Sequence, residues 1–424
     1  MLCREHRRDD GGITDGYAKF SIFNYQFTTY MKTILHLDMN SYFATAEQQV
    51  NPALRGRPVG IIKALDRGCV IAASIEAKKW GVKTGSTVWE AKRLCPQIVL
   101  VPADMEKYFC LTEKMIGIMN DYSPTVEIFS IDECFADITD SQKLFAGGMV
   151  EMALEIKQRV KLDLGEWMKC SIGVSFSKLT AKLASEMRKP DGLVILTPEN
   201  YVSETNEAKI EDVCGIGYAR TKYLHSRGAY TLGQARCLPH MPPEIDELVW
   251  LRLDEPLTTV AELERAKSVS RTYTTFARLD AQALILKLVR NLTEEATSKL
   301  REMKMAGRTF CLSLSSKENF FWARKTVKSA TDDPLVIYNA LAAEYERRPI
   351  IGIRQAGVWI SNLAFSVQRS FFERREEFLR AADAVNNKHG LFTVYPASLL
   401  GGELIRPEVT GYLGDKWYRF AKKD

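Results

Sequence analysis

Apolar residues recur along the chain at two spacings that alternate with each other. Short runs of apolar and β-branched residues, typical of strands, occur at residues 33–38, 126–138, 170–175 and 193–196. Helical spacing fills residues 105–122 and about 141–164, and it begins again near Ser177. This mixture predicts an α+β fold in which the strand-like runs belong to one sheet.

Two flanking regions show other patterns. Residues 55–96 predict a hairpin followed by short helices, with Gly81 and Gly85 as breaks. The first 30 residues have no clear periodicity, and Met31 directly precedes the first strand pattern. We therefore expect residues 1–30 to be a poorly ordered N-terminal extension that the function does not need.

A separate region, residues 270–363, shows strand and helix patterns in a definite order. FCLSLS and VWISNL alternate with period two, whereas Leu284, Leu288 and Leu292 recur at helical spacing. The expected strands are 270–276, 309–315, 319–328 and 354–363, and the expected helices are about 283–303 and 334–347. The order βαββαβ predicts a compact split-βαβ domain. After Phe365 the pattern predicts no particular fold.

Acidic residues stand at the ends of two expected strands. Asp132 and Glu133 lie between two strand-like runs, as at the tip of a hairpin, and Asp38 follows the buried run Ile34–Leu37. Adjacent acids are common in this chain, so a solvated hairpin tip is the simpler interpretation of the pair alone. If the runs form one sheet, Asp38 could lie beside the pair. Buried carboxylates then need a cation or a hydrogen-bond donor to stay ionised.

Composition narrows the class of protein. A chain of 424 residues with 46% hydrophobic content can bury several cores, and its length suggests roughly three or four domains. No apolar run reaches the roughly 20 residues that span a bilayer, and no signal-peptide pattern precedes the fold, so we expect a cytoplasmic protein without a membrane partner. The nine cysteines include no C-x-x-C pair and the five histidines do not cluster near them, which argues against structural zinc and a disulfide framework.

Positive charge is concentrated in one segment. The net charge is +5, whereas residues 268–365 alone contain 15 Lys or Arg against 9 Asp or Glu. A polyanion docking there would explain the excess, and so would an ordinary solvated surface. A second candidate contact is the turn with Gly215 and Gly217, whose backbone N–H groups could face a phosphate or could merely connect two helices.

Acids at strand ends of one sheet suit a pair of divalent ions. Mg²⁺ prefers carboxylates, waters and substrate phosphates to nitrogen or sulfur ligands. Two such ions about 3.5 to 4 Å apart can stabilise both the attacking and the leaving oxygen of a phosphoryl displacement. A polymerase palm uses this arrangement.

The chain resembles the Y-family translesion DNA polymerases. The resemblance is carried by HLDMNSYFA, SIDECF, GVSFSKLTAKLASEMRKPDG and EDVCGIG, in matching order from about residue 33 to 365. GCVIAASIEAKKWGVKTG, QAGVWISN and the extended C-terminal region look most like the UmuC-type branch, the catalytic subunit of bacterial DNA polymerase V. The implied reaction is template-directed addition of dNTPs to a primer 3′ end past DNA damage, in the SOS response.

The resemblance implies roles for individual residues. The two Mg²⁺ ions would be held by Asp38, Asp132 and Glu133, with the carbonyl of Met39 as a further ligand. The incoming nucleotide would be contacted by Tyr42, Phe43, Lys78 and Lys189, with Phe43 as the steric gate against ribose and Lys189 reaching the triphosphate. DNA contacts would come from Gly215, Gly217 and Arg271.

The resemblance also implies the right-hand architecture of polymerases, with palm, fingers and thumb. The palm would comprise residues 31–41 and 104–196, the fingers 42–103, a helical thumb with a helix-hairpin-helix 197–264, and the little finger 268–365. In the tail, residues 366–424, Gln368, Phe371 and Phe372 resemble a sliding-clamp binding motif, although the two aromatics could equally pack on the preceding domain. Expected partners are primer-template DNA, dNTPs, a sliding clamp and a UmuD-like accessory protein.

This sequence departs from the family pattern at one place. Polymerase IV-type members carry Thr, Tyr and Arg where this chain has Ala72, Ile75 and Lys78, and Lys does not replace the bidentate contacts of Arg. A loosened triphosphate pocket would fit low fidelity. The alternatives are a non-catalytic scaffold that binds DNA and clamp, and another palm enzyme such as a nucleotide cyclase.

Overall fold

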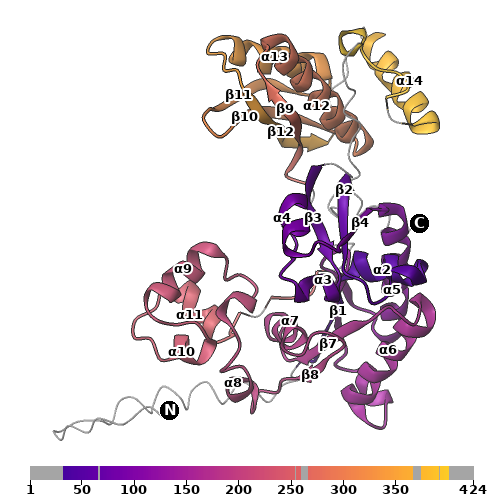
Figure 1. The fold of residues 1–424 in the computed structure, drawn as a ribbon, viewed down its shortest axis with the longest axis vertical. Coiled ribbons are helices and arrows are strands. Elements are labelled where there is room, and N and C mark those ends of the chain that lie inside the picture. The colour runs from indigo at the N-terminus through magenta and orange to yellow at the C-terminus, as the bar shows by residue number, and fades with distance from the viewer. Residues whose placement is uncertain are drawn as a thin grey trace, which may run out of the picture. The chain divides into compact units, whose positions relative to one another are not determined.

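The structure is a computed structural model that describes residues 32–64, 67–253, 255–258, 266–365, 374–390 and 392–400. The chain divides into two compact units, with the boundary between Glu262 and Leu263. Figure 1 shows the elements of each unit. The extension 1–30 and the clamp-motif residues Gln368, Phe371 and Phe372 lie outside the described residues. Within the described part, no helix is both long and apolar enough to cross a membrane.

A five-stranded sheet forms the centre of the first unit. Its strands stand in the order β5 (Val126–Ile128), β6 (Glu133–Asp137), β1 (Ile34–Met39), β7 (Cys170–Ser175) and β8 (Leu193–Ile195). β1 is antiparallel to both neighbours, and β7 is parallel to β8. The prediction that these runs form one sheet, with a hairpin around Asp132, is confirmed.

Helices cover this sheet. α5 (Met105–Tyr122) and α7 (Lys178–Met187) form where helical spacing predicts them, and Ser177 caps α7 by accepting from the Thr180 N–H. α2 (Tyr42–Val50) follows β1. The helix expected over 141–164 is interrupted, because a short 3-10 helix η2 (Ser141–Leu144) ends before Gly147, and α6 spans Gly148–Leu164 with Gly148 at φ +58°.

Gly173 allows α7 to approach the sheet closely. A Cβ at this position of β7 would lie 2.1 Å from the carbonyl oxygen of Ala181 in α7. The cross-strand partner of Gly173 is His36 of β1, so His36 also faces α7. The small residue therefore lets the backbone of α7 pack close to the sheet.

Residues 51–102 form a smaller layer. After a 3-10 helix η1 (Pro52–Leu54), the predicted hairpin is β2 (Val59–Ala64) with β3 (Arg67–Ala73), followed by α3 (Ile75–Lys79) and α4 (Val88–Leu94). Gly81 and Gly85 have φ +84° and +91°, as breaks between the helices require. A strand that the sequence pattern did not indicate, β4 (Val99–Pro102), pairs in parallel with β2.

The last part of the first unit is helical. It contains α8 (Tyr201–Glu204), a 3-10 helix η3 (Ile210–Asp212), α9 (Tyr218–Ser226), α10 (Leu232–Arg236) and α11 (Pro243–Val249). Their apolar residues share one core with Leu179 and Leu183 of α7. This core ties the helical segment to the five-stranded sheet.

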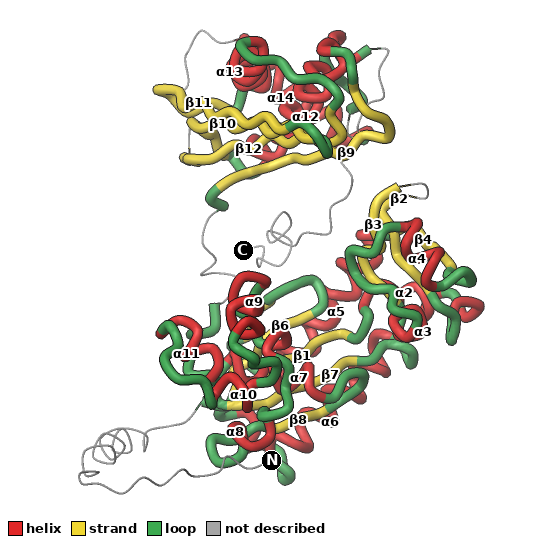
Figure 2. The backbone as a smooth tube through the Cα atoms, turned by 60° about the vertical axis from the view of Figure 1, so that its left-hand side comes forward, coloured by secondary structure: helices red, strands yellow, loops and turns green. Residues whose placement is uncertain are grey.

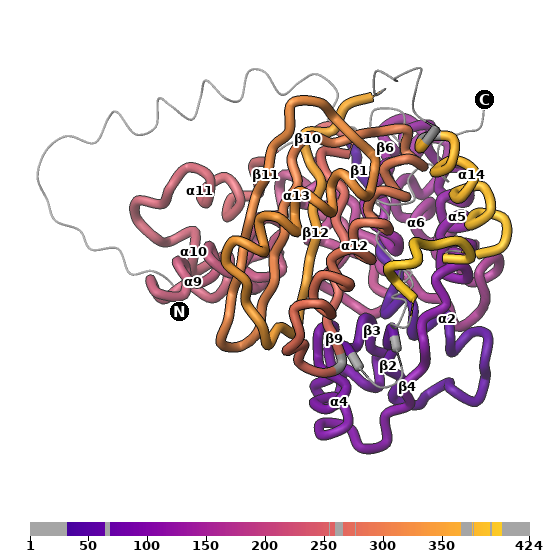
Figure 3. Tube along the Cα trace, turned by 90° about the horizontal axis from the view of Figure 1, so that it is seen from above, coloured from indigo at the N-terminus to yellow at the C-terminus, as the bar shows by residue number. Residues whose placement is uncertain are grey.

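The second unit has the predicted βαββαβ order. Its elements are β9 (Ser268–Leu279), α12 (Gln282–Glu302), β10 (Met305–Ser315), β11 (Phe320–Thr331), α13 (Pro334–Glu346) and β12 (Ile353–Phe365). The strands are antiparallel in the order β11-β10-β12-β9. α12 and α13 cover one face of the sheet (Figures 2 and 3).

The tail contains helical elements that the sequence pattern did not predict. α14 (Arg374–His389) is followed by a 3-10 helix η5 (Ala397–Leu399). Arg301 of α12 holds Asp383 of α14 with two bonds of 2.5 and 2.9 Å, and Arg375 Nε lies 2.5 Å from Asp333 Oδ2. Charged contacts therefore fix this helix to the second unit.

Candidate active site

β1 and β6 bring the predicted acids to one end of the five-stranded sheet. Asp38 and Glu133 are direct cross-strand partners, and the Met39 N–H donates to the carbonyl of Asp132 at 2.9 Å. The hairpin is fixed from α5 as well, because the Thr112 hydroxyl donates to the carbonyl of Ile131 at 2.6 Å. The two acids of the hairpin and Asp38, far apart in sequence, therefore form one group.

Asp38 is paired with the predicted triphosphate lysine. Lys189 Nζ lies 2.8 Å from Asp38 Oδ1 and 2.5 Å from Glu186 Oε1. Burial raises the pKa of Asp38, although the Lys189 charge opposes the rise. Burial works against the charge of Lys189 in turn, but Asp38 and Glu186 together outweigh it and raise the pKa of the ammonium.

Glu133 is held by α7 and by β1. His36 Nε2 lies 3.0 Å from Glu133 Oε2, Lys182 Nζ contacts the same oxygen, and His36 Nδ1 lies 2.7 Å from Ser185 Oγ. Burial disfavours the charge on Glu133, but the His36 hydrogen bond and the Lys182 ammonium together lower its pKa to about 2. Burial lowers the pKa of His36, and its Nε2 faces the Glu133 carboxylate, while the Ser185 hydroxyl donates to the carbonyl of Lys182.

Among the described residues, no lysine or arginine forms an ion pair with Asp132. Its Oδ1 accepts from Ser130 Oγ at 2.5 Å, and burial, followed by the charge of Asp38, raises its pKa to about 6. The hydroxyl of Ser130 offsets only part of this effect. Asp132 is thus the carboxylate of the group that would gain most from a bound cation.

The aromatic pair after Asp38 is packed against α5. The Tyr42 hydroxyl donates to the carbonyl of Tyr108 at 2.8 Å, and its ring is buried. Phe43 stacks on the Tyr108 ring with centroids 4.2 Å apart and planes 10° apart. The polar group of Tyr42 is therefore used inside the fold, and Phe43 is the ring held in a fixed orientation by Tyr108.

Lys78 lies on α3, within electrostatic range of the acid group. Burial and then the charge of Lys189 lower its pKa, while Asp38 and Asp132 act in the opposite direction. Ala72 lies on β3 and Ile75 begins α3. Lys78 and the other two departures from the family pattern thus lie on β3 and α3, and Lys78 is influenced by the charges of Asp38, Asp132 and Lys189.

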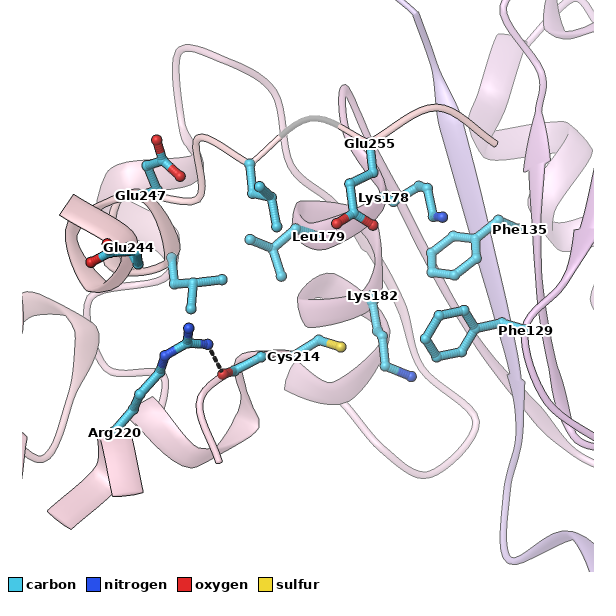
Figure 4. Close-up of a pocket in the computed structure, with 13 residues that line it drawn as sticks. Phe129, Phe135, Lys178, Leu179, Lys182, Cys214, Arg220, Glu244, Glu247 and Glu255 are labelled. Atoms are coloured by element: carbon cyan, nitrogen blue, oxygen red, sulfur yellow. Dashed lines mark hydrogen bonds between the residues drawn. The ribbon is translucent and has the colours of Figure 1, made fainter. Parts of the chain in front are cut away.

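The glycine turn borders a cavity of about 380 Å³ (Figure 4). Phe129, Phe135 and Lys182 line it on the sheet side, and Cys214, Gly215 and Arg220 line it on the helical side. Gly215 has φ +93°, its carbonyl accepts from Arg220 Nη1 at 2.6 Å, and Gly217 precedes α9. Lys182 Nζ lies 5.0 Å from the centroid of the Phe129 ring, so the cavity reaches the cation that holds Glu133.

Arg271 lies on the helix-covered side of the second unit. Its cross-strand partner is the buried Val358, and its Nε lies 3.9 Å from Glu295 Oε2. The opposite face carries Trp322 and Arg324 of β11, both exposed. The open face therefore exposes a cation and an aromatic ring to solvent, whereas Arg271 lies on the helix-covered side.

Comparisons with known proteins give the family. Residues 37–186 match the impB/mucB/samB family, and residues 266–371 match the C-terminal domain of that family. A DNA polymerase IV of Bacteroides fragilis (strain YCH46) is 30% identical over 346 residues, which cover 78% of this chain and 93% of the relative. A DNA polymerase IV of Moorella thermoacetica is 31% identical, over 87% of this chain and 96% of the relative. The chain belongs to the Y-family of DNA polymerases.

Solved structures agree with this Y-family fold. A Y-family DNA polymerase chimera of Dbh and Dpo4 aligns with a TM-score of 0.65 at 22% identity, over 79% of this chain and 100% of that chain. A post-insertion binary complex of Dbh DNA polymerase aligns with a TM-score of 0.52 at 22% identity, with the same coverage. The curated relatives named above are called DNA polymerase IV, and the UmuC-type assignment stays a prediction.

Sequence reasoning missed several residues of this polymerase that contact the acids or the partners of the acids. It assigned His36 no role, and it did not single out Lys182, Ser185 or Glu186. One signal was available, because His36 stands two positions before Asp38 on a strand and therefore shares its face. Lys182 could be found only once α7 was known to lie on β1.

Proposed function

We propose that this polymerase adds dNTPs to a DNA primer opposite damaged template bases by a two-metal phosphoryl transfer. The primer 3′-hydroxyl attacks the α-phosphate of the dNTP, and pyrophosphate leaves. The observation that carries the proposal is the cross-strand pair of Asp38 and Glu133 next to Asp132, with Lys189 Nζ 2.8 Å from Asp38.

The acids fit a pair of Mg²⁺ ions by their chemistry. Asp38, Asp132 and Glu133 supply carboxylate oxygens and Met39 supplies a carbonyl oxygen, which are the ligands that Mg²⁺ prefers. Within the described residues, no group of three or more His, Cys, Asp or Glu is already arranged around one point, and lysine ammoniums pair with Asp38 and Glu133. The pKa of Asp132 is raised to about 6, so a nearby positive charge would stabilise its ionised form. Mg²⁺ bound by these ligands would supply the Lewis acidity that stabilises the attacking and leaving oxygens.

The protein groups around the acids would bind and orient the nucleotide. Lys189 and Lys78 would neutralise triphosphate charge, and Phe43, held flat on Tyr108, would exclude a ribose 2′-hydroxyl. Tyr42 would support Phe43 rather than hydrogen-bond the nucleotide, since its hydroxyl already donates inside the fold. His36 would keep the Glu133 carboxylate in one orientation.

We assign the palm to residues 31–41 and 104–196, the fingers to 42–103, the thumb to 197–264 and the little finger to 268–365. DNA would meet the Gly215–Gly217 turn and the open face of the little-finger sheet. Arg271 would act from the edge strand β9, on the helix-covered side beside Glu295.

The wider context is also part of the proposal. We place the polymerase in the bacterial cytoplasm and in the SOS response, with Gln368, Phe371 and Phe372 as its sliding-clamp motif. A UmuC-type enzyme would need a UmuD-like partner for full activity. The three departures at Ala72, Ile75 and Lys78 favour a permissive nucleotide pocket in either branch.

Primer extension tests the function. The full chain should extend a primer with Mg²⁺ on undamaged and on damaged templates, and a sliding clamp and a UmuD-like protein should each increase the length of the products. Binding of primer-template DNA without any extension would favour the alternative, a non-catalytic scaffold of the same family.

A further inference from the structure

The turn that carries Lys189 is fixed from β1 and β7. The Asp191 N–H donates to Asn40 Oδ1 at 2.6 Å, and the Gly192 N–H donates to Ser171 Oγ at 3.3 Å. Asn40 Nδ2 in turn donates to Ser171 Oγ at 3.0 Å. Asn40 and Ser171 are both buried, so the turn is joined to the sheet next to Asp38 by a buried hydrogen-bond network.

Lys157 of α6 holds the same turn from the other side. Its Nζ donates to the carbonyls of Asp191 and Gly192, the latter at 3.1 Å, and lies 2.9 Å from Asp191 Oδ1. Lys157 is 9% exposed, and an ammonium at such a place is costly unless it is fully partnered. Each of these three contacts is made to Asp191 or Gly192.

The backbone at Asp191 shows why the turn needs this support. Asp191 has φ +58°, the left-handed region, which costs a non-glycine residue on the order of 1 kcal/mol. Lys161 Nζ adds a weaker contact at 3.2 Å to Asp191 Oδ2. A conformation of this kind persists when the surrounding contacts fix it, and here those contacts come from Asn40, Ser171 and the two lysines.

Lys189 stands two residues before Asp191, and its ammonium reaches Asp38. We propose that Lys157 is a positioning residue for nucleotide binding, which fixes the Asp191–Gly192 backbone and thereby places the Lys189 ammonium for the triphosphate of the incoming dNTP. This inference rests on the proposed function of Lys189. Lys157 itself contacts no substrate.

Lys157→Met removes the ammonium and keeps an unbranched side chain. The KM for dNTP should rise roughly tenfold, because a misplaced lysine loses ground-state contact with the triphosphate, while kcat changes less than about threefold. The affinity for primer-template DNA should stay the same. Steady-state kinetics gives the first two values, and dNTP binding to a complex with a dideoxy-terminated primer measures the loss without turnover.

A double-mutant cycle separates positioning from general stability. If Lys157 acts through Lys189, the double variant Lys157→Met, Lys189→Met should have the same KM for dNTP as Lys189→Met alone. Effects that multiply would show that Lys157 acts independently of Lys189, and they would overturn the inference. An equal loss of dNTP and DNA binding in Lys157→Met would also overturn it.

Arg159→Met is the matched control. It removes an ion pair of α6 with Asp121, 2.8 Å long, that does not touch the turn, so the KM for dNTP should stay within about twofold of wild type. Lys157→Arg should recover most of the dNTP affinity. If Lys157→Met does not fold, Asp191→Asn tests the same contact, since it weakens the ion pair without changing shape, and the KM for dNTP should rise about threefold.

The outcomes also distinguish the inference from the proposed function. A wild-type chain that fails to extend any primer would refute the function. A wild-type chain that extends primers while Lys157→Met and Asp191→Asn keep the wild-type KM would refute only the positioning role of Lys157.

Discussion

The two larger sheets of the molecule carry their charged residues in different surroundings. In the five-stranded sheet, Asp38 and Glu133 lie at strand ends and each has lysine or histidine partners at fixed positions. In the four-stranded sheet, Arg324 is exposed on the open face of β11, next to Trp322, which is 47% exposed. The first arrangement fixes the position of charge, and the second presents charge to solvent.

This difference has a thermodynamic consequence. Buried, partnered carboxylates interact through short contacts that salt screens little, whereas exposed cations contribute through long-range attraction that salt weakens. Changes in the first sheet should therefore affect the rate of chemistry and leave DNA binding unchanged. Changes on the open face of the second should do the reverse.

Asp132→Asn should produce the largest effect. It keeps the shape of the side chain and removes its charge, so kcat for primer extension should fall at least about 10³-fold, equivalent to about 4 kcal/mol of transition-state stabilisation. The Kd for primer-template DNA should change less than about threefold. Single-turnover extension and a DNA-binding titration on the same preparation measure both values.

Asp140→Asn is the control for this change. Its carboxylate is 87% exposed, pairs with Lys143 and lies outside the acid group, so both kcat and DNA affinity should stay at wild-type values. Primer extension by Asp132→Asn at more than a tenth of the wild-type rate would contradict the assignment of the acids.

Phe43→Ala tests whether the fixed position of the Phe43 ring determines which nucleotide is accepted. Because the ring is fixed by stacking on Tyr108, its removal should open space for a ribose, and the preference for dNTP over rNTP should fall about 10²-fold. The ratio of kcat/KM for the two substrates measures it. Phe43→Leu should lie between wild type and alanine, and an unchanged preference in Phe43→Ala would remove Phe43 from the gate.

The open face of the second unit should respond to salt. Replacing the exposed Arg324 and Lys328 of β11 by alanine should weaken DNA binding about tenfold, and if each contacts one phosphate the slope of log K against log salt should fall by about 1.8. Extension at saturating DNA should keep its rate. Arg347→Ala at the C-terminal end of α13, where Arg347 pairs with Glu344 at 3.0 Å, should leave the slope unchanged.

The order of elements could be read from the sequence, because each strand and helix carries its own spacing of apolar residues. The βαββαβ unit, the hairpin around Asp132 and the strand before Asp38 are cases of this kind. β4 was missed because Val99–Pro102 is short, ends in proline and depends on parallel pairing with β2, which no local pattern shows. α6 began later than expected because Gly147 and Gly148 interrupt the helical spacing.

Some contacts of the candidate site could also be predicted from the sequence, and others could not. The approach of Asp38 to Glu133 followed from two strand ends in one sheet. The contacts around these acids could not be predicted, since Lys182 reaches Glu133 and Ser185 reaches His36 only because Gly173 lets α7 lie on the sheet. The contact of Arg271 with Glu295 likewise depends on which face of β9 the helix α12 covers.

The smallest expected effect concerns stability. It separates the effect of the Asp132 charge on folding from its role in catalysis. The pKa of Asp132 is about 6 in the folded protein, above its unfolded value of 3.8. Its protonated form therefore favours folding below about pH 4, and that contribution is lost as the pH rises through 6. Asp132→Asn should match the wild-type Tm near pH 4 and exceed it at pH 7.5, by roughly 2 to 6 °C in the presence of a chelator. Calorimetry at the two pH values, with Asp140→Asn alongside, measures the difference. A variant less stable than wild type at pH 7.5 would mean that the Asp132 charge is already compensated in the metal-free protein. The difference between the buried acids of the first sheet and the solvated charges of the second would then not hold for Asp132.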